Sequence, residues 1–452
     1  MSSRRSFIQN ALSLGAGLVA AAKAFASPQP QHHQMQMSER PHAPARKVRG
    51  SRVAQPALVE TPDVPQLPWQ MVDGAKEFHL VAEPVKRRLI PGRDMEVWGY
   101  NGSCPGPTIQ VNQGDRVRIV FENRLPESST IHWHGLEVPV EMDGLPYISQ
   151  KPVPPGGKFV YEFALHQAGT FFYHSHGAMQ EMMGMIGLFI IHPENPWTPR
   201  VDHDFGIVLQ EWAILPNNNV PNTANMEFNW LTFNGKAAPD TTPLVVRHGS
   251  RVRIRLVNLG MDHHPIHLHG NTFFVTGTEA GRQPETRWGI ENTVLVGVAQ
   301  ARDIEFEATY LGNWMLHCHL PHHMMNSMSD LIGDRMMATM QLNDKDALMQ
   351  MQTFADNIGI EHIHHAPIAP EANRVPGFPQ DAFMEMGMDK AVYRPENYGL
   401  PPNWSAGAMG MMALVRVVPD EFYEKLMTMR AQGESKPPQQ PEHIHEQPKG
   451  RP

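Results

Sequence analysis

The chain has 452 residues, enough for one large or two to three ordinary domains, and its net charge of −8 gives no support for a nucleic-acid-binding role. It contains 29 methionines and 25 histidines but only two cysteines, Cys104 and Cys318. This composition makes soft-metal binding a serious competitor to loose core packing. If Cys318 binds a metal, no disulfide framework remains, and Cys104 is expected to be an ordinary loop or buried thiol.

The N-terminus predicts an export signal. Arg4-Arg5 precedes an apolar run over 11–22 and small residues at 24 and 26, the order of a twin-arginine signal over 1–26 that is cleaved before Ser27. A short N-terminal helix fits less well because it does not require this order. The run is too short to remain as a membrane span. We therefore expect a periplasmic protein with no membrane anchor and a disordered linker over 27–70.

From residue 71 onward the pattern is all-β. Segments 108–111, 116–121 and 159–163 alternate with period two, and Gly, Pro and Asn separate them. The pattern returns at 244–256 and 303–306, and 410–419 resembles 184–191. These repeats predict two copies of one β-sandwich or barrel domain, at 71–197 and 198–420. A Met-rich insertion at about 329–406 would interrupt the second copy, and 421–452 would form a C-terminal tail.

Four His-x-His pairs carry the candidate chemistry. In a strand, residues two apart share a face with Cα atoms roughly 6.5 Å apart, which suits ligands of adjacent metals. Each pair ends a predicted strand before a turn with Gly or Pro: His132 and His134, His174 and His176, His267 and His269, His317 and His319. Chance pairing in a His-rich chain accounts for the pairs at 362–364 and 443–445. A hydrolytic zinc site would need an Asp-His completion that is absent after His134.

Cys318 lies between His317 and His319 and therefore points to the opposite strand face. Because His323 and Met328 follow, the stretch is typical of a blue-copper site, in which a thiolate, imidazoles and a weak thioether bind copper. Four motifs occur in order: HWHG at 132–135, HSH at 174–176, HPIHLH at 264–269 and HCH-x3-H-x4-M at 317–328. With these motifs the chain resembles the two-domain, laccase-like multicopper oxidases over about 70–330 and in the strand at 410–419.

The resemblance implies two cupredoxin-like Greek-key domains and four coppers per active unit. The type 1 copper would be bound by His264, Cys318 and His323, with Met328 axial, and the type 2 copper by His132 and His267. The type 3 pair would be bound by His134, His174, His176, His269, His317 and His319. Ser175 stands where a second blue copper would need a cysteine, so the first domain would lack a type 1 site.

The resemblance also implies an assembly and an activity. Two-domain relatives build the trinuclear cluster between subunits, which implies a homotrimer, and the 185 positions from His132 to His317 leave no room for a third domain. Electrons would pass from the type 1 copper through Cys318, and dioxygen would be reduced to water at the cluster. Asp143 falls where relatives place a proton-relay carboxylate, although an Asp-Gly turn would use the same residue. A second such position, a carboxylate in some relatives, is Met324 here.

The many methionines give an indication of the reducing substrate. Thioethers favour Cu(I), so cuprous-ion oxidation in copper tolerance is the leading hypothesis, and phenol oxidation by a general small laccase is the alternative. Met384, Met386 and Met388 would either bind soft metal or pack a lid. Another group would pack beneath the following strand: Met179, Met182, Met183 and Met185. A copper nitrite reductase is disfavoured because such enzymes lack His-Cys-His, and a copper-storage protein would not need eight paired histidines.

Overall fold

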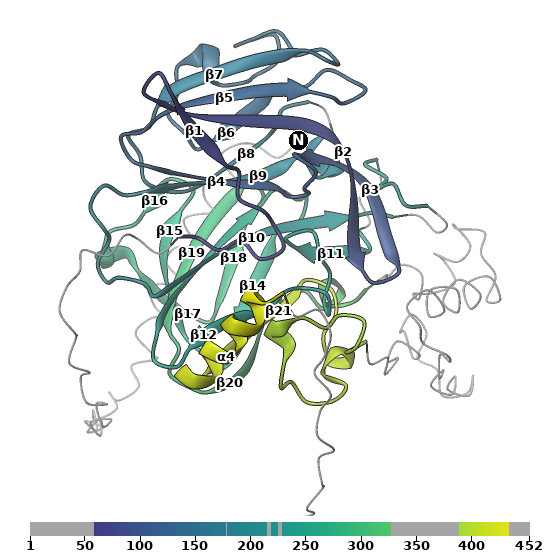
Figure 1. The fold of residues 1–452 in the computed structure, drawn as a ribbon, viewed down its shortest axis with the longest axis vertical. Helices are drawn as coiled ribbons and strands as arrows, with labels where there is room; N and C mark the ends of the chain where they lie inside the picture. The colour runs from purple at the N-terminus through teal and green to yellow at the C-terminus, as the bar shows by residue number, and fades with distance from the viewer. Residues whose placement is uncertain (1–57, 178, 215–217, 225–227, 327–387, 434–452) are drawn as a thin grey trace, which may run out of the picture. The chain divides into compact units, whose positions relative to one another are not determined.

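The computed structural model describes residues 58–433 apart from 178, 215–217, 225–227 and 327–387 (Figure 1). All of the described residues belong to one compact unit that spans residues 55–452. Within them, no helix has both the length and the apolar character needed to cross a membrane.

The first half of the described chain forms two sheets. In β5, Val117, Ile119 and Phe121 are buried and the residues between them are not, as period-two alternation predicts. One sheet has the order β1-β2-β5-β7 with β3 beside β2, and the other has the order β4-β9-β8-β6. The bounds are β1 Trp69–Val72, β2 Ala75–Ile90, β3 Arg93–Tyr100, β4 Gly106–Asn112, β5 Arg116–Asn123, β6 Ile131–His134, β7 Lys158–Ala164, β8 Gly169–Ser175 and β9 Ile186–His192.

The second half also forms two sheets. Their orders are β11-β10-β13-β19-β15-β16, with β17 beside β15, and β12-β21-β20-β14-β18. The bounds are β10 His203–Trp212, β11 Trp230–Phe233, β12 Leu244–Arg247, β13 Arg251–Asn258, β14 His264–Leu268, β15 Phe273–Thr278, β16 Gly281–Arg282, β17 Gly289–Glu291, β18 Thr293–Val296, β19 Gln300–Glu307, β20 Gly312–Cys318 and β21 Met412–Val418. One α-helix, α4 Asp420–Ala431, follows β21.

Short 3-10 helices connect several of these strands. Those used below are η1 Val140–Met142, η2 Glu181–Met183 and η4 Pro321–Met324; the others in the described ranges are η3 Glu285–Arg287, η7 Pro395–Asn397 and η8 Trp404–Gly407.

The two halves repeat one pairing scheme. The parallel pair β2–β5 and the antiparallel pair β5–β7 recur as β10–β13 and β13–β19. The path β4-β9-β8-β6 recurs as β12-β21-β20-β14, and in both the first pair is parallel. The predicted all-β fold with a duplicated β-sandwich domain is therefore confirmed.

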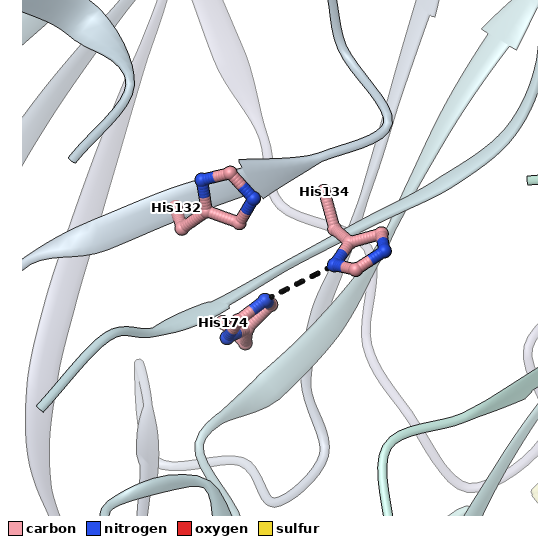
Figure 2. A group of neighbouring side chains, drawn as sticks. All are labelled: His132, His134 and His174. Carbon is pink, nitrogen blue, oxygen red and sulfur yellow. Dashed lines mark hydrogen bonds between the residues drawn. The ribbon is translucent and has the colours of Figure 1, made fainter. Parts of the chain in front are cut away.

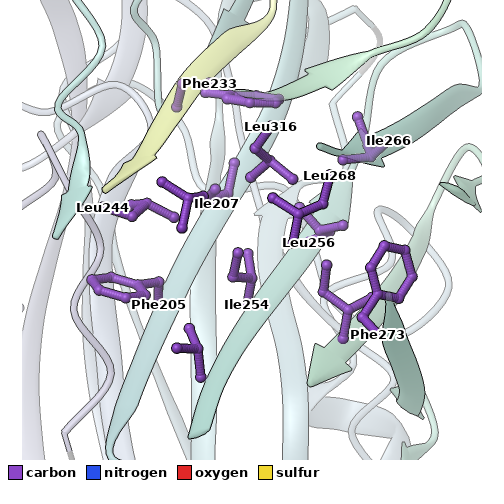
Figure 3. Packing of buried hydrophobic residues seen from close by; sticks show 14 of the residues in the cluster. Phe205, Ile207, Phe233, Leu244, Ile254, Leu256, Ile266, Leu268, Phe273 and Leu316 are labelled. Atoms are coloured by element: carbon purple, nitrogen blue, oxygen red, sulfur yellow. The ribbon is translucent and has the colours of Figure 1, made fainter. Parts of the chain in front are cut away.

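Each half has its own hydrophobic core between its two sheets. In the second half, Ile207 of β10 and Ile254 of β13 pack with Ile266 of β14 and Leu316 of β20 (Figure 3). Cys318 belongs to this same buried cluster, so the core fixes the end of β20. A further buried cluster joins the halves, because Phe172 and Leu188 of the first half pack with residues of the second.

Two terminal segments differ from the prediction. Within the expected linker over 27–70, the described residues 58–70 are structured: Val59 is buried and Glu60 bridges to Phe205. The expected tail at 421–452 begins as α4, which buries Leu426 and Met429 against the β12–β21 side of the second half. Both segments gain their order from tertiary contacts, which local composition does not reveal.

Candidate metal centres

A thiolate centre lies at the end of β20 in the second half. Cys318 ends β20, His264 begins β14 and His323 lies in η4, and all three side chains are buried. The Cys318 Sγ is 3.3 Å from Nδ1 of His323 and 3.8 Å from Nδ1 of His264, and the two Nδ1 atoms are 3.2 Å apart. The predicted trio is therefore brought together with three donor atoms facing one point.

Burial sets the protonation of this centre. It raises the pKa of the Cys318 thiol to about 12 and lowers the pKa of His264 to about 3 and of His323 to about 4. Both imidazoles are thus neutral near pH 7, with a lone pair available, while the thiol stays protonated until a cation displaces the proton. One thiolate and two neutral imidazoles match the donor set of a blue-copper site.

Two carboxylates face the outer nitrogens of these imidazoles. Glu211 Oε2 is 3.6 Å from His264 Nε2, and Asp262 Oδ2 is 3.6 Å from His323 Nε2. Both Nε2 atoms are buried without a hydrogen-bond partner. The arrangement leaves the Nδ1 atoms for a metal and turns the Nε2 atoms toward carboxyl oxygens, the usual surroundings of a metal-bound histidine. Burial raises the pKa of the Glu211 carboxyl to about 7.

The histidines of the first half converge on one strand face, as the spacing predicts. His132 and His134 lie on β6, and His174 lies beside them on β8 (Figure 2). Nδ1 of His134 is 3.4 Å from Nε2 of His174, and the ring of exposed His176 is 5.7 Å from that of His132. Burial lowers the pKa of His134 to about 4 and also lowers the pKa of His132.

The second half presents a matching set. Rings of His267 and His269 lie 4.9 Å apart, and His269 Nε2 is 3.0 Å from His317 Nε2. His319 completes the set, with its ring 5.5 Å from that of His267. Among the described residues, no ring contact joins a histidine of this set to one of the first-half set.

Backbone carbonyls fix the tautomers of four of these histidines. Their Nδ1 atoms lie 2.7–2.9 Å from carbonyl oxygens: His132 from Asp143, His174 from Ser175, His267 from Asn292 and His317 from Cys318. Nδ1 then carries the proton, and Nε2 is the atom left to bind a metal.

Two carboxylates lie beside the first-half histidines. Asp143, singled out from the sequence, places Oδ1 3.3 Å from Nδ1 of His132. Glu181 of η2, which the sequence analysis missed, places Oε1 3.0 Å from Nδ1 of His174. Glu181 lies in a Met-rich stretch without strand periodicity, so no local signal points to it. Glu211 lies in the buried strand β10 and Asp262 lies between β13 and β14, and only the tertiary fold brings them beside the thiolate centre.

The remaining sequence predictions have mixed outcomes. Cys104 is a buried thiol whose Sγ is 3.5 Å from the Gly184 carbonyl oxygen, as expected for a packing role. Met185 is buried beneath β9 as predicted, whereas Met182 and Met183 are half-buried and Met179 is exposed. Met388 is buried. Met328, Met384, Met386 and the pairs at 362–364 and 443–445 lie outside the described residues.

Comparison with known proteins agrees with this geometry. Two family models described as multicopper oxidase match residues 83–196 and 214–331, together half of the chain. Copper resistance protein A of Pseudomonas syringae pv. tomato is 33% identical over 151 residues, which is 33% of this chain and 25% of that protein. Laccase-2 of Botryotinia fuckeliana is 31% identical over 250 residues, which is 48% of this chain and 42% of that protein. The matches thus span less than half the length of these relatives.

Solved structures give the same result. The blue copper oxidase from Nitrosomonas europaea is 31% identical with a TM-score of 0.52, covering 56% of this chain and 81% of that one. The multicopper oxidase mgLAC is 31% identical with a TM-score of 0.53, covering 56% and 82%. The family models include all four histidine pairs and Cys318. The chain belongs to the multicopper oxidase family.

Proposed function

We propose that the protein is an oxidase that takes single electrons from a reducing substrate at the thiolate centre and reduces dioxygen to water where the histidine sets meet. Cys318 carries this proposal, because it belongs to the thiolate centre while its neighbours His317 and His319 belong to the second-half histidine set. The polypeptide therefore links the two centres covalently. Bound copper would supply the redox chemistry by cycling between its cuprous and cupric states.

The donor atoms fit copper at both kinds of centre. We assign the type 1 position to His264, Cys318 and His323, since their donor atoms lie within 4.8 Å of one another and are sheltered from water. The type 2 position is assigned to His132 and His267. The type 3 positions are assigned to His134, His174, His176, His269, His317 and His319, which with the type 1 copper makes four coppers per active unit.

We infer that the dioxygen site is shared between copies of the chain. Each half offers four histidines, and the described structure joins the two sets by no ring contact. Large apolar side chains are exposed beside each set: Tyr147 (85%) and Ile148 (78%) follow the turn at Gly144 that abuts β6, and Leu295 (55%) lies on β18 next to β14. We propose a homotrimer in which the first-half set of one subunit meets the second-half set of the next.

Asp143 is proposed to deliver protons to this site. Its carboxylate lies beside His132 and lines an open recess of about 750 Å³, so a proton can reach it from solvent. The Asp143 carbonyl oxygen also holds His132 Nδ1 at 2.9 Å, so the residue orients the ligand that it serves.

The proposed reductants are cuprous ion and phenols. Relatives named copper resistance protein A favour the former, and relatives named laccase favour the latter. With the export signal predicted over 1–26, we propose periplasmic copper tolerance as the role. A copper-storage role is the competing proposal, and it predicts copper binding without dioxygen consumption.

The direct test is dioxygen uptake by copper-loaded protein supplied with Cu(I) or with a dimethoxyphenol. The proposal expects uptake with at least one donor, and its loss in Cys318→Ser, which retains the histidine sets. Full copper loading without uptake would contradict the oxidase and favour storage.

A further inference from the structure

The first half contains a counterpart of the thiolate centre in which two serines and a glutamine replace the cysteine and the two histidines. Ile131 pairs with Ser175 in the β6–β8 ladder as Ile266 pairs with Cys318 in the β14–β20 ladder. In the same register, His132 pairs with His174 and His267 pairs with His317. Counting from these pairs, Ser129 corresponds to His264, Ser175 to Cys318 and Gln180 to His323.

These counterparts also meet in space. Ser129 Oγ donates to Gln180 Oε1 at 2.8 Å, lies 3.2 Å from Ser175 Oγ, and Ser175 Oγ donates to the same Gln180 oxygen. All three side chains are buried. Hydrogen bonds thus hold together the positions that converge on the thiolate centre in the second half, so the register comparison locates equivalent points in space.

The comparison extends to a fourth position. In the first half, the Ser175 N–H donates to the Met185 carbonyl at 3.1 Å, and the Met185 N–H donates to the Gln180 carbonyl at 3.4 Å. In the second half, the Cys318 N–H donates to the Met411 carbonyl at 3.0 Å, and the Met411 N–H donates to the His323 carbonyl at 2.9 Å. Both methionines are fully buried and follow a glycine of positive φ. Met411 is therefore the counterpart of Met185.

Counting along the sequence selects a different methionine. Met185 lies ten positions after Ser175, and ten positions after Cys318 is Met328. The backbone pairing selects Met411, because Met411 is hydrogen-bonded to Cys318 and His323. Gly410 fixes this position: its N–H donates to Asn326 Oδ1 at 2.8 Å, and a Cβ there would lie 2.3 Å from the His323 carbonyl oxygen.

Met411 also lies on the correct face. Met412 pairs with His317 and thus shares the histidine face of the sheet. Met411, one residue earlier, shares the opposite face with Cys318 and belongs to the same buried cluster as Cys318 and Ile266.

We propose that Met411 supplies the weak thioether ligand of the copper bound by His264, Cys318 and His323, so that two ligands of one copper, His323 and Met411, lie on either side of the Met-rich insertion in the sequence. The assignment rests on the blue-copper centre proposed above. The position of the axial ligand matters because that ligand tunes the reduction potential of such copper.

Three methionine-to-leucine variants test the assignment, since leucine conserves volume. They are Met411→Leu, the rival Met328→Leu and the matched control Met412→Leu, which changes an adjacent buried methionine on the other face. The readouts are the thiolate–copper absorption band and the reduction potential of that copper. We expect Met411→Leu to keep the band and raise the potential, because Cu(II) loses a donor, while the other two match wild type. Met411→Gln, which replaces the thioether by an amide oxygen that favours Cu(II), is expected to lower the potential.

A changed potential in Met328→Leu with none in Met411→Leu would overturn the assignment, as would wild-type potentials in both Met411 variants. Wild-type protein that binds copper without a thiolate–copper band would instead overturn the blue-copper centre itself. The two failures are therefore distinguishable from the wild-type spectrum alone.

Discussion

At the scale of single residues, burial and the hydrogen bond of one ring nitrogen decide which nitrogen of each histidine can bind a metal. The thiolate-centre imidazoles turn Nδ1 inward, whereas four histidines of the two sets hold Nδ1 against carbonyl oxygens, so that Nε2 is the nitrogen that would bind a metal. The period-two alternation of strands places these histidines, which is why the sequence could predict them. Glu181, Glu211 and Met411 come close to the centres only through tertiary folding, so no local sequence pattern predicts their positions.

Replacing Asp143 by Asn removes the proposed proton donor but keeps the carbonyl that orients His132. We expect dioxygen turnover to fall about 100-fold or more, the scale of general acid catalysis, with copper content and the thiolate–copper band unchanged. Glu141→Gln, two residues away and exposed, serves as the control. Wild-type turnover in the Asp143 variant would remove the residue from the proton path.

Glu181→Leu tests whether the carboxylate beside His174 supports metal binding. Because such partners orient and polarise a ligand, copper affinity at the histidine sets should fall about 10- to 100-fold, while the thiolate centre keeps its copper. Glu137→Leu is the matched control, since Glu137 holds His166, a histidine outside the proposed ligands, at 2.5 Å. Equal copper retention in both variants would show that Glu181 has no such role.

At the scale of elements, buried charged residues of β10, β13 and β19 are linked to one another and to Thr170 of β8. Arg255 Nη1 donates to Thr170 Oγ1 at 2.6 Å, Thr170 donates to Asp303, and Arg253 pairs with both Asp204 and Glu305. This network crosses from the first half to the second beside their shared apolar cluster. It therefore helps hold the two halves in one compact unit.

Glu305 makes this network sensitive to acid. Burial alone raises the pKa of Glu305, but Arg253 and Arg282 outweigh it and bring the pKa to about 2. The unfolded value is about 4.3, so the stabilisation is present above that pH and is lost as pH falls toward 2. Glu305→Gln should cost about 3–5 kcal/mol in unfolding free energy at pH 7, and the difference from wild type should shrink between pH 5 and pH 2. A pH-independent difference in denaturant titrations would contradict this linkage.

The segment between η4 and β21 is a further element with a testable role. Gly410 is hydrogen-bonded to Asn326, so the two ends of the segment 327–409 lie next to each other. Within this segment, several residues of 388–406 are buried. Replacing 329–387 by a flexible Gly/Ser linker should therefore preserve the thiolate–copper band. If the methionines gather cuprous ion, Cu(I)-driven uptake falls and phenol-driven uptake rises; unchanged rates with both donors would leave packing as their only role.

Predictability from sequence also differs by element. The strands were predictable because alternation and turn residues are local, and the duplication because the pattern recurs. Helix α4 was not predicted, although Asp420 and Glu421 in its first turn and Arg430 in its last suit the helix dipole. The helix is stabilised by the packing of Leu426 and Met429. The Pro/Gln-rich residues that follow it led to the prediction of a tail for the whole of 421–452.

At the scale of the whole molecule, the sequence placed two of the four histidine pairs in each repeated domain, and the structure shows that the four rings within each domain lie close together. Sequence order cannot say whether two sets meet within a chain or between chains, because both arrangements satisfy the same strand geometry. The shared arrangement proposed above therefore needs a test that distinguishes the two cases.

The most direct test of a shared dioxygen site is subunit complementation. One variant carries His132→Ala and His134→Ala, the other carries His267→Ala and His269→Ala, and each keeps the thiolate centre. Each alone should bind copper at Cys318 but consume no dioxygen. Co-assembled from the unfolded or co-expressed chains, the pair should regain dioxygen uptake, because an intact first-half set of one chain then meets an intact second-half set of the other. Mixed assemblies, verified by mass, that remain as inactive as either variant alone would contradict a site shared between subunits.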